Sequence, residues 1–173
     1  MPPRAIIGVM GRGSDASAED VHLAEEVGER IAREGWILLT GGRREGVMGA
    51  ASRGAKRVEG SLTVGILPGG DRSGMAPDVD VPIVTGMGSA RNNVNALSSD
   101  VVIACGEGGP GTISEIALSI KTGKPVVLLR PALAVYEMFA PIAPVHPADS
   151  VDEAIAIVRA IIAGRSSYNS SSS

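Results

Sequence analysis

An arginine and a glutamate are the residues of this sequence whose types and setting best suit chemistry on an anionic ligand. Arg91 falls in the first turn of a helix predicted to begin at Ser89, where a cation opposes the helix dipole and an anion would relieve the cost. Contact with a ligand is favoured over a salt bridge to Glu115. Glu115 follows Thr112 by three residues, which fits a capping box. A carboxylate that activates water or stabilises an oxocarbenium-like centre fits equally well.

Other polar side chains near these two carry weaker signals. Arg43 could add positive charge to the same region, although a solvated turn is the simpler interpretation. Asn92, Asn93 and Asn95 are unusual early in a helix, and some are expected to line a site, with a solvent-facing Asn95 left open. Cys105 ends an aliphatic run and is expected to be a small core residue rather than a nucleophile. The two histidines lack metal-ligand spacing, so no protein-ligated metal is expected.

Four glycine-rich turns follow aliphatic runs that read as strands. They contain Gly11 and Gly13, Gly41 and Gly42, Gly69 and Gly70, and the run Gly106, Gly108, Gly109 and Gly111. Ligands of open parallel sheets bind beyond the carboxyl ends of the strands, where glycine lets backbone N–H groups approach an anion. The turns therefore favour an anionic or nucleotide-like ligand over a purely structural role. The glycine order excludes the NAD fingerprint, and the last turn lacks the lysine of a P-loop, so neither NAD nor an ordinary ATPase is expected.

The elements that position these turns alternate along the chain. Strands are predicted over residues 5–9, 36–39, 63–67, 81–84, 101–104 and 125–129, and helices over 18–33, 46–58, 89–97, 112–121, 133–139 and 151–163. Ser17 is expected to cap the first helix. Repeated βαβ units with right-handed crossovers predict a Rossmann-like, doubly wound parallel sheet with helices on both faces. We expect one domain over residues 1–165 and a flexible tail over 166–173.

Composition supports a globular α/β protein and excludes several classes. Of the 173 residues, 44% are hydrophobic and only 2% aromatic, which suits aliphatic parallel strands. A net charge of −3 without a basic stripe argues against nucleic-acid binding. Apolar runs are too short to span a membrane, no secretory segment is visible, and the single cysteine suits a reducing compartment. The cytoplasm is the expected location.

Three motifs together resemble a known superfamily. They are Thr40-Gly41-Gly42 followed by Gly46-Val47-Met48, then Gly88-Ser89-Ala90-Arg91, then Gly109-Pro110-Gly111-Thr112-x-x-Glu115. The chain resembles the superfamily of the LOG cytokinin-activating phosphoribohydrolases, and within it the molybdenum cofactor carrier proteins. The stretches 35–42, 81–86 and 89–99 are similar to the carrier subgroup, and the resemblance covers about residues 6–129.

The resemblance implies a homo-oligomer that binds and protects molybdenum cofactor, a phosphorylated pterin, without changing it. Molybdoenzymes or cofactor-synthesis proteins are possible partners. The binding residues expected on this basis are Gly11, Gly13, Ser14, Thr40, Gly41, Gly42, Arg43, Pro68, Gly69, Ser89, Arg91, Asn92, Gly108, Gly109, Gly111 and Thr112.

A phosphoribohydrolase that cleaves nucleoside 5′-monophosphates such as AMP is the alternative. In that case Arg91 and Glu115 are the catalytic residues implied by the resemblance. The sequence departs from the hydrolase pattern because Glu107 stands where the hydrolases have the first proline and Asn92 replaces a basic residue. These changes add a carboxylate near the phosphate-binding turn and remove a positive charge, which counts against efficient hydrolysis.

Overall fold

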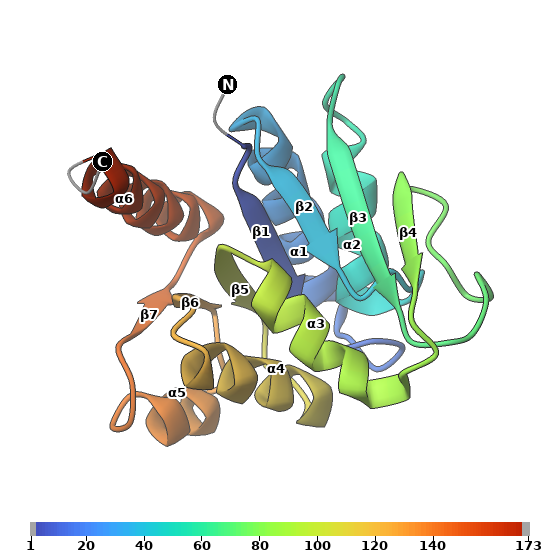
Figure 1. Ribbon diagram of the computed structural model, residues 1–173. Helices are drawn as coiled ribbons and strands as arrows, with labels where there is room; N and C mark the ends of the chain where they lie inside the picture. Colours follow the sequence, from blue (N-terminus) through green and yellow to red (C-terminus); the bar gives the residue numbers. More distant parts are fainter. Residues whose placement is uncertain (1–2, 171–173) are drawn as a thin grey trace.

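A computed structural model describes residues 3–170 and shows a single parallel sheet with helices on both faces (Figure 1). The strands are β1 (Ile6–Met10), β2 (Ile37–Thr40), β3 (Leu62–Leu67), β4 (Val81–Val84), β5 (Val101–Cys105), β6 (Val126–Leu129) and β7 (Val145–Ala148). The helices are α1 (Ala18–Arg33), α2 (Gly46–Ala55), the short 3₁₀ helix η1 (Gly88–Ala90), α3 (Arg91–Ser98), α4 (Pro110–Lys121), α5 (Leu133–Phe139) and α6 (Val151–Ser170). The seven strands lie in the order β4-β3-β2-β1-β5-β6-β7, so the predicted Rossmann-like fold is confirmed.

Two hydrophobic layers cover the sheet. One contains buried residues of α1, α2 and α6 packed on strand residues such as Ile7 and Ile103. The other contains residues of α4 and α5, including Ile116 and Phe139, packed on the opposite face. Successive strand side chains point to opposite faces, which is why aliphatic residues run continuously along β1 and β5.

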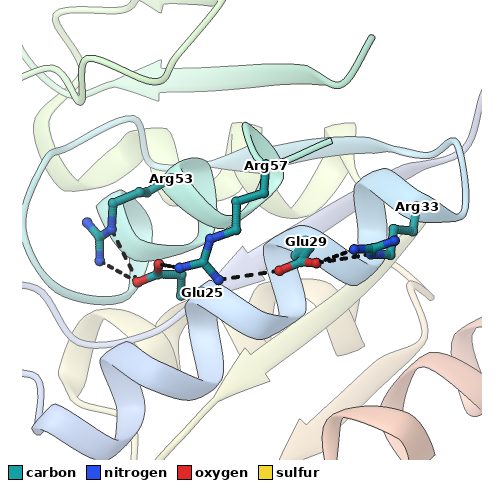
Figure 2. Close-up of polar contacts among 5 residues, drawn as sticks. All are labelled: Glu25, Glu29, Arg33, Arg53 and Arg57. Atoms are coloured by element: carbon teal, nitrogen blue, oxygen red, sulfur yellow. Dashed lines mark hydrogen bonds and ion pairs between the residues drawn. The ribbon is translucent and has the colours of Figure 1, made fainter. Parts of the chain in front are cut away.

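Helices α1 and α2 lie against each other more closely than ordinary side chains allow. A β-carbon at Gly28 would lie 1.9 Å from the carbonyl oxygen of Ala51, and one at Gly54 would lie 1.8 Å from that of Glu25. Arginines of the α2 region, Arg53 and Arg57, pair with Glu25 on α1, and Figure 2 shows the network continuing along α1. Glycine contacts and surface ion pairs together hold this helix pair on one face of the sheet.

Several elements differ from the sequence expectations; helix α2, for example, ends at Ala55 rather than at residue 58. Strand β7 occupies a segment that we expected to be a proline-rich loop. Helix α4 begins at Pro110, two residues earlier than expected, because proline is favoured in the first helical turn. Helix α6 continues to Ser170 and so includes residues 166–170 of the expected tail. Residues 171–173 of that tail lie outside the described residues, and the domain boundary at 165 stays a prediction. Within residues 3–170, no helix combines the length and apolar character that a membrane crossing requires.

Candidate functional site

A cavity of about 210 Å³ opens beside the carboxyl ends of β1, β2 and β5. Between β1 and β5 the strand order changes direction, and ligands of open α/β sheets bind at such a point. We call this hollow the switch-point cavity; it is lined by Val9, Met10, Gly11, Gly13, Gly41, Arg43, Met48, Arg91, Asn92, Gly111, Thr112 and Glu115. Of the residues predicted from sequence, nine meet here, and they come from four separate segments of the chain.

Arg91 is the dominant charge of the cavity. It is only 8% exposed, and neither its Nε nor its Nη1 atom has a hydrogen-bond partner within residues 3–170. Burial lowers its pKa, the nearby Glu115 opposes that change, and Arg43 adds to it. An arginine has so high an ordinary pKa that it stays charged at neutral pH. The cavity therefore holds a buried cation with free hydrogen-bond donors.

The position of Arg91 depends on two neighbouring turns. The carbonyl oxygens of Pro68 and Gly69 accept hydrogen bonds from the amides of Gly88 and Gly86, at 2.9 and 2.8 Å, which ties the segment before η1 to the end of β3. Arg91 then begins α3 directly after η1, rather than following a helix start at Ser89. On the other side, a β-carbon at Gly41 would lie 1.9 Å from Nη1 of Arg91, so glycine makes room for the guanidinium.

Glu115 is buried beside Arg91 but is bonded to a different residue. Its Oε1 atom accepts a hydrogen bond from Nδ2 of Asn95 at 2.7 Å. Burial raises the pKa of Glu115 to about 7, against the opposing effects of Asn95 and Arg91. The capping-box interpretation is wrong, because α4 has Gly109 at its N-cap and no side-chain cap. The alternative of an Arg91–Glu115 salt bridge is also absent from the described residues.

The N-terminal turn of α4 is held in place by a chain of polar contacts. Asn92 donates from Nδ2 to the hydroxyl of Ser114 at 2.8 Å, and that hydroxyl donates to the carbonyl of Gly111 at 2.7 Å. Thr112 is buried in the same turn. Backbone N–H groups at a helix N-terminus attract anions, so this turn complements Arg91 across the cavity.

Eight predicted binding residues do not line the cavity: Ser14, Thr40, Gly42, Pro68, Gly69, Ser89, Gly108 and Gly109. Several of them shape it from outside. The Thr40 hydroxyl accepts from the amide of Gly42 at 3.0 Å, which closes the turn after β2, and the carbonyl of Gly108 accepts from Nε of Arg12. Ser14 and Ser89 are exposed. Their role as ligand contacts stays a prediction.

The sequence interpretation missed part of the lining. Val9, Met10 and Met48 give the cavity an apolar wall. Asn95, for which a solvent-facing position was left open, is fully buried and binds Glu115. Its spacing of four residues from Arg91 on α3 was the available signal, since residues four apart share a helix face. Cys105 is fully buried and burial raises its thiol pKa to about 12, which fits the expected core role.

Comparisons with known proteins agree on one family. Residues 4–155 match the model of the SLOG cluster4 family. The structure of the molybdenum cofactor binding protein of Rippkaea orientalis is 51% identical, with a TM-score of 0.90 over 92% of this chain and 98% of that one. The molybdenum cofactor carrier protein of Chlamydomonas reinhardtii is 48% identical, with a TM-score of 0.87 over 93% of this chain and 99% of that one. A cytokinin riboside 5′-monophosphate phosphoribohydrolase of Mycobacterium tuberculosis is 35% identical over 72% of this chain and 70% of its own length.

Proposed function

Since this chain belongs to the SLOG cluster4 family, we propose that it binds molybdenum cofactor and carries it without changing it chemically. The phosphate of the cofactor would lie in the switch-point cavity. The observation that carries the proposal is Arg91, a buried guanidinium with unpartnered Nε and Nη1 atoms in the described chain, which lines the same cavity as the N-terminal turn of α4. A buried charge without a partner is costly, and an anionic ligand offsets that cost. Close structural homologues at about half identity are molybdenum cofactor carriers, which supports the same ligand.

Part of the cavity wall suits holding a ligand rather than reacting with it. This part includes Met10 and Met48, which supply apolar contact, and backbone groups of Gly11 and Gly41, which supply no reactive side chain. The volume of about 210 Å³ is below the range of about 300–1,000 Å³ typical of sites for drug-sized ligands. The cavity therefore suits the anionic end of a larger molecule.

The test is cofactor loading in cells that make molybdenum cofactor. We expect the purified chain to contain molybdenum, by elemental analysis, and pterin, by fluorescence after oxidation, in near-equal amounts. Arg91→Met should lower both at least tenfold, because it removes the charge at similar length. Arg44→Met is the matched control, since Arg44 is an exposed arginine in the turn between β2 and α2, outside the cavity. Equal loading of the two variants would contradict the proposal.

A second function is favoured by one observation, the presence of Arg91 and Glu115 in the same cavity. This pair could serve hydrolysis of a nucleoside 5′-monophosphate, in which water attacks ribose C1′, the N-glycosidic bond breaks and a proton passes to the leaving nitrogen. Glu115 with a pKa near 7 could accept the proton of water at neutral pH.

Free adenine released from AMP, measured by chromatography, separates the two functions. A carrier should release none above the uncatalysed rate, whereas a hydrolase should lose its release in Glu115→Gln. Release that survives in Glu115→Gln would point to a contaminating enzyme and would remove the support for the hydrolase.

Assembly into homo-oligomers belongs to the same proposal. Exposed apolar side chains follow one another along the edge strand β4 and the turn after it: Val81, Ile83, Val84 and Met87, each between 42% and 47% exposed. We call these residues the β4 edge surface. Sheet edges with apolar side chains are normally covered, and a second copy of this chain is the occupant that we propose. Delivery to molybdoenzymes, and location in the cytoplasm, are further parts of the proposal that rest on the sequence.

A further inference from the structure

The two buried charges of the switch-point cavity line the same space but do not pair. Arg91 is 8% exposed and Glu115 is 6% exposed, and both line the cavity. Burial raises the pKa of Glu115, and the charge of Arg91 opposes that rise, so the two groups lie close enough to interact. Yet Nε and Nη1 of Arg91 have no hydrogen-bond partner within residues 3–170. A buried guanidinium and a neighbouring carboxylate ordinarily form an ion pair, so another contact must keep them apart here.

That contact is the side chain of Asn95. Its Nδ2 atom donates a hydrogen bond to Oε1 of Glu115 at 2.7 Å, and both side chains are buried. Asn95 follows Arg91 by four residues on α3, and Glu115 lies on α4, which packs beside α3 (Figure 1). One helix therefore carries both the cation of the cavity and the amide that holds the neighbouring carboxylate.

Asn95 keeps this bond at a cost in hydrogen bonding. It is fully buried, and its Oδ1 atom has no hydrogen-bond partner in the described part of the chain. An ionised carboxylate only accepts, so the amide nitrogen must point to Glu115, and the amide oxygen is left without a donor. An apolar side chain of the same shape would avoid the unpaired oxygen. Packing alone therefore does not explain an asparagine at this position, whereas a need to hold Glu115 does.

The other cation that lines the cavity is already engaged. The Arg43 side chain is half-exposed, and its Nε atom pairs with Oε2 of Glu45 at 3.4 Å. Of the two arginines in the cavity wall, Arg91 is therefore the one that is free to pair with a Glu115 released from Asn95.

We propose that Asn95 is a positioning residue for anion binding, which holds Glu115 and so keeps Arg91 free for the phosphate of the ligand. Without the amide, Glu115 and the phosphate would compete for the same guanidinium. That the competing anion belongs to molybdenum cofactor rests on the proposed function, whereas the competition itself needs only an anion in the cavity.

A double-mutant cycle tests this role, with inorganic phosphate as the probe at about pH 8, above the pKa of about 7 of Glu115. Asn95→Leu nearly keeps the shape of the side chain and removes its amide. We expect it to raise the Kd for phosphate, measured by phosphorus NMR titration, about tenfold or more, because the freed carboxylate takes the guanidinium. In the Glu115→Gln background the same substitution should change the Kd by no more than about twofold, since glutamine brings no charge to Arg91.

The cycle distinguishes positioning from a purely structural role. A structural role of Asn95 would lower the phosphate affinity by a similar factor in both backgrounds, and that result would overturn the proposal. Asn93→Leu is the matched control, because Asn93 is exposed on the same helix and lies outside the cavity. We expect it to leave the Kd unchanged in both backgrounds.

A crystal structure of ligand-free Asn95→Leu gives a second measurement, which needs no ligand. We expect the Glu115 carboxylate to be bonded to the Arg91 guanidinium in this variant. Thermal midpoints show whether the variant folds, and Asn95→Ala, which removes the same amide with a smaller side chain, takes its place if it does not. A Glu115 that stays apart from Arg91 without the amide would overturn the assignment.

These measurements separate failure of the positioning role from failure of the carrier function. Molybdenum loading that is lost in Arg91→Met but normal in Asn95→Leu would refute the role of Asn95 and leave the carrier function standing. Phosphate affinities that show the expected coupling, in a chain that never loads molybdenum, would keep the role of Asn95 and refute the carrier.

Discussion

At the scale of single residues, the site depends on space made for Arg91. Gly41 lies against the guanidinium so closely that an added methyl group would overlap Nη1. The φ angle of Gly41 lies outside the left-handed region, so the clash, and not backbone strain, is the effect of adding a side chain. A substitution at Gly41 therefore changes where the charge of Arg91 lies without removing that charge.

Gly41→Ala should therefore weaken anion binding while keeping the arginine. We expect molybdenum loading to fall at least tenfold, because the guanidinium must move out of the cavity, and a displacement of about 1 Å can cost such a factor at a preorganised site. Gly70→Ala is the matched control: an added β-carbon there would meet no atom of the described chain within 4 Å. Normal loading of Gly41→Ala would show that Arg91 tolerates another position.

Glu115 makes stability depend on pH in a window set by its two pKa values. In the folded chain its pKa is about 7, and its ordinary value is 4.5. Between these values the folded state holds a proton that the unfolded state releases, so the unfolding free energy falls as pH rises from 4.5 to about 7.

In Glu115→Gln the unfolding free energy should not fall with pH in this way, and the amide oxygen of the glutamine can still accept the hydrogen bond from Asn95. Urea unfolding at several pH values measures the difference in unfolding free energy between the variant and the natural chain. This difference should rise in favour of the variant by about 1–3 kcal/mol across the window and stay constant at higher pH. Glu137→Gln, at an exposed residue of α5, controls for removal of one carboxylate. A difference that stays constant with pH would mean that Glu115 ionises as freely in the folded chain as in the unfolded one.

At the scale of elements, the α1–α2 pair is the part of the scaffold with the least tolerance. Gly54→Ala would place a methyl group 1.8 Å from a backbone oxygen of α1, and backbone cannot move aside as a flexible side chain can. We expect a loss of about 1–3 kcal/mol or more in the unfolding free energy. Gly164→Ala in α6 is the control, because no described atom lies within 4 Å of its added carbon and alanine favours a helix by about 1 kcal/mol. A neutral Gly54→Ala would show that the helices can separate.

The elements also show what local sequence can and cannot predict. Helix α1 has the expected bounds because Ser17 accepts from the amide of Asp20 and a strong apolar stripe follows. Strand β7 was missed because His146 and Pro147 interrupt any aliphatic run, and only its pairing with β6 makes it a strand. Arg91 and three of the four glycine turns could be predicted from sequence to reach the cavity, since strand ends and helix starts are local signals, whereas the Gly69–Gly70 turn does not line it. The bond between Asn95 and Glu115 joins two helices, and no local pattern encodes it.

At the scale of the whole molecule, the expected homo-oligomer needs a surface through which copies of the chain can pack. The aliphatic residues Ile113, Ile116 and Ile120 of α4 pack toward the sheet, so they are not free to contact a second copy. The β4 edge surface, by contrast, is exposed in the described chain. Its strand contains Pro82, which has no backbone N–H to donate and so limits further strand pairing along the edge.

Ile83→Lys should shift the chain toward monomers, because a charge in an apolar contact is costly. Light scattering on a sizing column measures the mass. Leu133→Lys, at an exposed apolar residue of α5 on another part of the surface, tests whether any added charge has this effect. A natural chain that elutes as a monomer at all concentrations would contradict the assembly.

The hydrogen bonds from Gly86 and Gly88 to the end of β3 hold the short segment that connects β4 with the helix of Arg91. That segment leaves β4 on one side and begins the helix of Arg91 on the other, so a second copy seated on β4 would also restrict the guanidinium. Thermodynamic linkage is reciprocal. If self-association orders Arg91 and so favours ligand binding, then binding of the ligand to Arg91 strengthens self-association by the same factor. The affinity for molybdenum cofactor should then rise with protein concentration. At high protein concentration the chain should keep the bound cofactor, and on dilution it should release it.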